Sequence, residues 1–121
     1  MEVRVETITW LSEAAQEAEV VVCSQLGKLL AFCQPCELSV GQVIAGPIHA
    51  FAARNIQLEL QAAPSIQTTD GLRHSVVGTL TDHAQQLVQS CGFTIQIDDY
   101  LPGGIQAGDT VLFECGRLDI W

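Results

Sequence analysis

The sequence predicts an all-β single domain that spans residues 1–121, a small antiparallel barrel or sandwich of about eight strands with one short helix near the N-terminus. Three observations predict this class. Apolar and polar residues alternate in nearly every segment, glycine and proline recur at turn spacing between the segments, and only one stretch has a helical pattern. An OB-like barrel is one form that such a chain takes.

The N-terminal third predicts a strand, a short helix and a hairpin. Residues Glu2–Thr9 alternate as a strand does, and Ser12–Ala18 begins with a capping residue that is followed by glutamate and alanine. Two apolar runs, Val20–Cys23 and Lys28–Cys33, are separated by a short segment that contains a glycine. We expect these two runs to pair as an antiparallel hairpin.

The middle of the chain predicts two extended segments. The first, Val43–Ala53, is broken at Gly46 and Pro47, because proline cannot donate to a central ladder. The second, Ile56–Gln61, has the cleanest alternation in the chain, and its isoleucine and two leucines are expected to point inward.

The last part of the chain predicts further strands joined by two recognisable turns. Asp70-Gly71 favours a two-residue hairpin, because both residues tolerate positive φ, and Pro102–Gly104 favours a tight turn. The predicted strands are Arg73–Leu80, Leu87–Cys91, Phe93–Asp98 and Val111–Cys115. We expect no linker, internal repeat or low-complexity tract.

The chain is strongly acidic, with 14 acidic and 5 basic residues and a net charge of −9. This charge repels nucleic-acid phosphates unless the cations are clustered. The cations are instead scattered along the sequence: Arg4, Lys28, Arg54, Arg73 and Arg117. We therefore expect no nucleic-acid binding, and a basic protein is the natural electrostatic complement.

The sequence predicts no secretion signal and no membrane span. Its first six residues alternate in charge without an apolar leader core, and the longest uncharged stretch, residues 38–53, is interrupted by glycine, proline and histidine. Five cysteines cannot all pair within one chain, which favours a reducing compartment. We expect a cytoplasmic protein.

Cys33 and Cys36 lie in a C-x-P-C motif, the one motif in the sequence whose residue types and spacing indicate a possible redox or metal site. Thioredoxin-like redox sites place the first cysteine at a helix N-terminus, whereas residues 38–44 here read as loop and strand. The two thiols have the spacing of half a zinc site, but no second pair completes it. Any metal site would need a distant histidine, from His49, His74 or His83. We expect no metal or cofactor, and we expect at least one of the two thiols to be accessible near a turn.

No complete catalytic motif is present. The sequence contains neither a nucleophile elbow nor a glycine-rich phosphate loop. The neighbouring carboxylates Asp98 and Asp99 point to opposite faces if they lie in a strand, which opposes a paired acid–base role. They more naturally end a strand and protect its edge.

These observations favour a non-enzymatic protein-binding module. A concrete form is a bacterial immunity-type inhibitor that masks a basic toxin or enzyme. The candidate contact residues are Glu59, Asp98, Asp99, Tyr100 and Glu114. Charged residues make up only 16% of the chain, so self-association into a homo-oligomer is also plausible. The alternative is a small-ligand-binding or enzymatic β-barrel that uses Cys33, Cys36 and a histidine.

Overall fold

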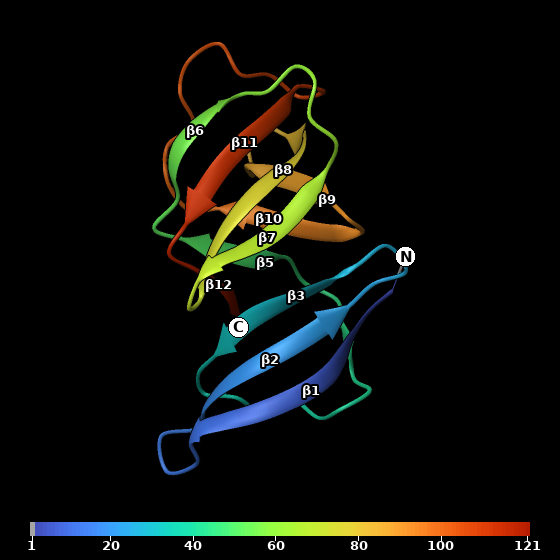
Figure 1. Ribbon diagram of the computed structural model, residues 1–121, viewed down its shortest axis with the longest axis vertical. Helices are drawn as coiled ribbons and strands as arrows, with labels where there is room; N and C mark the ends of the chain where they lie inside the picture. Colours follow the sequence, from blue (N-terminus) through green and yellow to red (C-terminus); the bar gives the residue numbers. More distant parts are fainter. Residues whose placement is uncertain (1) are drawn as a thin grey trace.

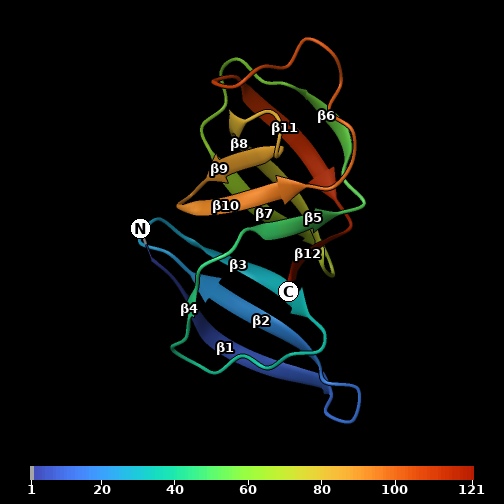
Figure 2. The same ribbon diagram turned by 180° about the vertical axis from the view of Figure 1, so that it is seen from behind.

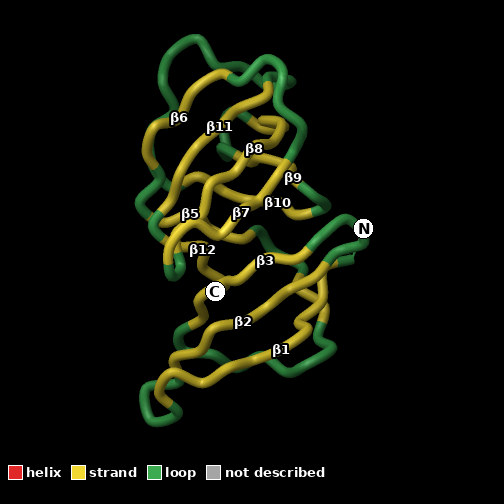
Figure 3. The backbone as a smooth tube through the Cα atoms, viewed as in Figure 1, coloured by secondary structure: helices red, strands yellow, loops and turns green. Residues whose placement is uncertain are grey.

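A computed structural model describes residues 2–121, and all regular secondary structure in that range consists of β-strands (Figure 3). The strands are β1 (Val3–Ser12), β2 (Glu17–Cys23), β3 (Lys28–Cys33), β4 (Val43–Ile44), β5 (Ile48–Phe51), β6 (Arg54–Leu58), β7 (Ser65–Asp70), β8 (Arg73–Asp82), β9 (Leu87–Ser90), β10 (Phe93–Ile97), β11 (Thr110–Cys115) and β12 (Arg117–Ile120). The predicted all-β class is confirmed.

The strands form one open mixed sheet rather than the predicted antiparallel barrel or sandwich. Its order is β4-β1-β2-β3-β12-β5-β10-β9-β8-β11-β6, and β7 pairs with β8 beside this path. Most neighbours are antiparallel, but β12 runs parallel to β3 and β10 runs parallel to β5. These two parallel pairs require long connections, which the alternation pattern of a sequence does not reveal.

The predicted helix at Ser12–Ala18 is wrong, because β2 already begins at Glu17 and the preceding residues form a turn. Ser12 does act as a cap, since its Oγ accepts a hydrogen bond from the amide of Ala15 at 3.2 Å. Gln16 then adopts a left-handed backbone with φ of 55°, and this reverses the chain instead of continuing it into a helix.

Several predicted turns are confirmed. The runs that became β2 and β3 pair antiparallel, with Val20 opposite Ala31. A two-residue hairpin joins β7 to β8 as predicted, but its turn is Gly71-Leu72, because Asp70 is the last residue of β7 and pairs with Arg73. The break at Gly46 and Pro47 separates β4 from β5.

The predicted inward orientation of the Ile56–Gln61 leucines is wrong. The strand here is β6, which ends at Leu58 and lies at one edge of the sheet. Leu58 is 47% exposed and Leu60 is 88% exposed, because no strand covers the outer side of this edge in the part of the chain that the structure describes.

The two halves of the sheet, β1–β5 and β8–β12, share one topology, which no sequence pattern predicted. In each half, three antiparallel strands are followed by a strand that pairs with the first of them: β4 with β1, and β11 with β8. The last strand of each half then pairs parallel with the third strand of the other half. The two last strands, β5 and β12, pair antiparallel at the centre (Figures 1 and 2).

Local geometry follows the same duplication. The turn before β9 repeats the turn before β2, with an aspartate cap on residue 85 at 2.9 Å and Gln86 at φ 55°. A glycine with positive φ precedes β4 and β11 alike, at φ 90° for Gly41 and 97° for Gly108. Each of these loops exchanges two backbone hydrogen bonds with the first strand of its half: Gly41 to Val5, Val5 to Gln42, Gly108 to Leu80 and Leu80 to Asp109.

The core lies on the inner faces of the strands. Buried side chains at alternate positions come from both halves and include Val20, Ala31, Ile48, Ile95, Phe113 and Leu118. Within residues 2–121, the structure has no helix that is long and apolar enough to cross a membrane.

Candidate functional site

Four strands at the centre of the sheet, β3, β12, β5 and β10, join the two halves, and we call them the seam. Their alternate residues on one side are buried in the core: Ala31, Cys33, Ile48, Ala50, Ile95, Ile97, Leu118 and Ile120. The residues between them form the outer face of the seam: Phe32, His49, Phe51, Gln96, Asp98, Arg117, Asp119 and Trp121. Strand register places these side chains together, because residues directly opposite each other project to the same face.

Arg117 is fixed at the middle of this outer face. Its guanidinium carbon lies 4.3 Å from the ring centroid of Phe32 and 5.0 Å from that of Phe51. Its Nε and Nη2 donate to the two carboxylate oxygens of Asp119 at 2.6 and 3.1 Å. A planar cation held between two aromatic rings by a bidentate carboxylate has few rotamers left to lose. This part of the face is therefore rigid.

His49 and Trp121 form a second cluster beside the first. Their rings are stacked, with centroids 3.7 Å apart and planes 15° apart. His49 is buried, whereas Trp121 is 78% exposed and covers it. The His49 Nδ1 lies 3.5 Å from Oδ1 of Asp98, and this buried nitrogen has no hydrogen-bond partner among the described residues.

The structure brings some of the predicted contact residues together and separates others. Asp98, Asp99 and Tyr100 follow β10 directly, and Tyr100 is 96% exposed. Glu114 lies on β11 and its carboxylate is 3.5 Å from Nε of Arg54. The ends of β10 and β11 both lie beside the end of β5, since Ile97 pairs with Ala50 and the amide of Gly116 donates to the carbonyl of Phe51.

Glu59 lies away from this group. It follows the far end of β6, where its amide donates to the carbonyl of Thr110 at the start of β11. Five residues of extended chain separate it from Arg54, about 16 Å at the usual rise per residue. The predicted contact set is therefore not one patch.

The thiols of Cys33 and Cys36 are buried, so their predicted accessibility is wrong. Burial, and then a hydrogen bond with Cys36, raise the pKa of Cys33 to about 12. The thiolate is the reactive and metal-binding form, so this environment opposes both roles at neutral pH. Burial likewise raises the pKa of Cys115 to about 11.

No histidine of the outer face completes a site with these thiols. Cys33 projects into the core, whereas His49 lies on the opposite side of the seam. His74 is buried on β8, and its ring nitrogens lie 3.3 Å from the hydroxyl of Thr68 and 2.8 Å from the carbonyl of Leu72. Burial lowers the pKa of His74. The described residues contain no group of three or more His, Cys, Asp or Glu that could hold a metal ion.

A largely apolar groove of about 470 Å³ adjoins the outer face. It lies between the loop after β3, strand β4 and the end of β12, and Glu37 is the one charged residue that lines it. A smaller hollow of about 90 Å³ lies over Phe32, Arg117 and Asp119. Ile120 and Trp121 line both, so Trp121 stands at the junction between the groove and the seam.

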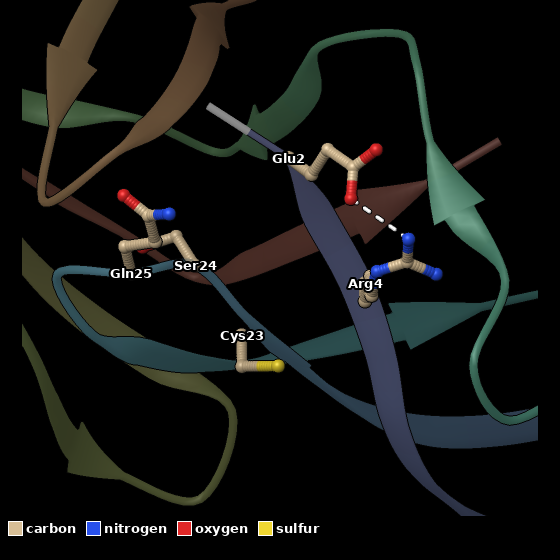
Figure 4. A pocket seen from close by; sticks show the side chains of 5 residues that line it. All are labelled: Glu2, Arg4, Cys23, Ser24 and Gln25. Atoms are coloured by element: carbon tan, nitrogen blue, oxygen red, sulfur yellow. Dashed lines mark hydrogen bonds and ion pairs between the residues drawn. The ribbon is translucent and has the colours of Figure 1, made fainter.

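Another hollow, of about 500 Å³, lies near the start of β1 (Figure 4). Its one cation, Arg4, is already neutralised: one nitrogen is 2.8 Å from the Glu2 carboxylate, and another donates to the carbonyl of Gly41 at 2.9 Å. The remaining lining residues are Cys23, Ser24 and Gln25. These side chains offer neither a charged anchor nor an acid–base pair.

Sequence reasoning missed the centre of the outer face. The signal was present, because residues 117–121 alternate as Arg, Leu, Asp, Ile and Trp, with the two apolar aliphatics inward. The prediction ended the last strand near Cys115, whereas Gly116 only bends the chain between β11 and β12. Comparison with protein-family models, with curated proteins and with solved structures found no match to this chain.

Proposed function

We propose that this protein is a non-enzymatic module that binds a basic protein through the outer face of the seam. The observation that carries the proposal is the gathering of Phe51, Arg117 and Trp121 on one face, with Phe51 53% exposed and Trp121 78% exposed. Aromatic residues and arginine dominate the few positions that supply most of the binding energy in protein interfaces. A face held in place before binding also loses little side-chain entropy.

The charge of the chain defines the kind of partner. The net charge of −9 attracts a basic surface, and Asp98 lies on the outer face with Asp99 and Tyr100 next to it in the chain. An inhibitor that masks a basic toxin or enzyme, the immunity-type role, matches this combination of acidic charge and an aromatic centre.

The proposal is tested by capture with matched surface variants. The protein and two double variants are immobilised and exposed to extract from the source cells. Phe51→Ala with Trp121→Ala removes the aromatic centre. Leu26→Ala with Leu60→Ala is the control, because these leucines are 66% and 88% exposed but lie outside the seam.

A basic protein that is retained by the wild type and by the leucine control, lost from the aromatic variant and eluted by salt supports the proposal. Equal retention by all three surfaces contradicts it, as does retention of acidic proteins alone. Circular dichroism and thermal melts of each variant show that the aromatic variant is folded.

A second candidate is a small-ligand binder that uses the groove beside Cys33. The volume of about 470 Å³ and the mostly apolar lining favour it, since small-molecule sites commonly have these properties. Its enzymatic form has less support, because the thiols of Cys33 and Cys36 are buried and His49 lies on the other face. Native mass spectrometry of protein purified from source cells, showing one bound metabolite and no protein partner, would favour this candidate.

A further inference from the structure

We propose that Asp98, His49 and Trp121 form a receptor for a single basic side chain, the ammonium of a lysine or the guanidinium of an arginine. This inference rests on the proposed function, because it names the group through which the basic partner is recognised. It assigns separate tasks to three residues that three different segments bring together: β5, the segment after β10, and the end of β12.

The carboxylate of Asp98 is available to a foreign cation. Its side chain is 41% exposed, and among residues 2–121 it pairs with no lysine or arginine. The nearby cation, Arg117, is already occupied by both oxygens of Asp119. Among the described residues of the outer face, Asp98 is therefore the acidic group whose charge is not neutralised by a lysine or arginine of the chain.

His49 supplies an unused hydrogen-bonding atom at the same place. Its side chain is 10% exposed, and Nδ1 faces Asp98 at 3.5 Å, longer than a normal hydrogen bond. Nδ1 is covered in this arrangement, so a cationic donor reaches it only after the exposed Asp98 side chain turns. When the ring proton is on Nε2, Nδ1 is then an acceptor beside the carboxylate. A buried polar atom without a partner is the kind of group that a ligand satisfies.

Trp121 supplies the apolar wall. One face of its indole is stacked on His49, so the other face remains open to the partner. The open face lies on the far side of the indole from His49, so a basic side chain packs its aliphatic stem there and passes its charged head over the ring edge to Asp98. The adjoining groove, lined by Ile44, Leu38 and Ile120, has room for the aliphatic residues beside the basic one.

The same groups oppose other ligands. An anion is repelled by Asp98 and by the net charge of −9. A divalent metal ion is opposed by the donor set, since the described residues contain no group of three or more suitable ligands. A monovalent organic cation on a protein side chain is the class that one carboxylate, one imidazole and one indole match.

The test uses two blocked peptides, Ac-Gly-Arg-Gly-NH2 and the same peptide with citrulline in place of arginine, which preserves shape and removes charge. Nuclear magnetic resonance of the whole protein follows the ring signals of His49 and Trp121 at low salt. We expect both signals to move progressively with the arginine peptide, and to move at least fivefold less with citrulline at equal concentration.

Asp98→Asn is expected to reduce the movement at least fivefold, whereas Asp99→Asn is the matched control and preserves it. Absence of movement, equal movement with both peptides, or equal loss in the two aspartate variants would overturn the inference. Capture of a basic protein that is lost with the aromatic variant but unaffected by Asp98→Asn would refute this receptor alone and leave the protein-binding function standing.

Discussion

Gly78 offers a sharp test of how closely β8 and β9 approach each other, because there is no space at this position for an added methyl group. A Cβ at this position of β8 would lie 2.6 Å from the carbonyl oxygen of Gln89, 2.7 Å from Cγ1 of Val88 and 2.9 Å from Cβ of Ser90. All three atoms belong to β9, the strand paired with β8, and one of them is backbone. The strand pair cannot relax by moving one flexible side chain.

We therefore expect Gly78→Ala to destabilise the fold by about 2–3 kcal/mol, the upper part of the range for overpacked cores. Alanine also reduces the entropy of the unfolded chain and so offsets part of this loss, by about 0.4–1 kcal/mol. Urea unfolding followed by circular dichroism measures the difference. With a slope of about 2 kcal/mol/M, a net loss of about 2 kcal/mol moves the midpoint down by about 1 M.

Gly46→Ala is the matched control, since a Cβ there meets no atom within 4 Å and the backbone does not have a positive φ. Its midpoint should be unchanged or slightly raised. If Gly78→Ala unfolds at the same urea concentration as Gly46→Ala, the close approach of β8 and β9 is wrong.

Three further predictions concern titration, thiol reactivity and association. Burial lowers the pKa of His74 below its ordinary 6.5, so unfolded chains bind this proton first, and the stability present above about pH 6.5 is lost as the pH falls, by at most about 1.4 kcal/mol per pH unit. The urea midpoints at pH 7.5 and pH 5.5 should therefore differ less in His74→Gln than in the wild type, and an unchanged difference would contradict this. Alkylation by iodoacetamide followed by mass mapping should modify Cys33 at least tenfold more slowly in the folded than in the urea-unfolded protein, because its pKa is raised from 9.0 to about 12 and the thiolate is scarce; equal rates would refute burial of this thiol. Asp99→Asn should slow association with the basic partner more than it speeds dissociation, because a charge outside the contact acts mainly on the encounter. An association rate that does not change with the variant or with salt would exclude electrostatic steering.

The class of the fold and most of its hairpins followed from local signals. The turn between β7 and β8 and the interruption before β5 depend on the backbone preferences of Gly71 and Pro47, which tertiary packing did not override. The prediction of a helix at Ser12–Ala18 was wrong because a serine can cap a tight turn as well as a helix. The left-handed backbone angle at Gln16 decides between the two, and glutamine has no intrinsic preference that would predict it.

The site was harder to predict because it depends on non-local register. Arg117, Phe32 and Phe51 meet only because β12 inserts between β3 and β5. Single-sequence alternation shows which side of its own strand a residue occupies, but not which strand becomes its neighbour. Charge alone predicts both Asp98 and Glu59 as contact residues, but Asp98 lies at the outer face, whereas Glu59 lies at the far end of β6.

The duplicated topology explains how one face came to hold two different clusters. His49 on β5 lies opposite Asp119 on β12, and these central strands occupy equivalent places in the two halves. Each of the two strands brings one exposed aromatic side chain to this face, Phe51 at the end of β5 and Trp121 directly after β12. Their surroundings differ, since Arg117 packs on Phe51 while His49 covers one side of Trp121. The cation on the Phe51 side is already bound within the chain, so the Trp121 side, with the free carboxylate of Asp98, is the one left to accept a cation from a partner.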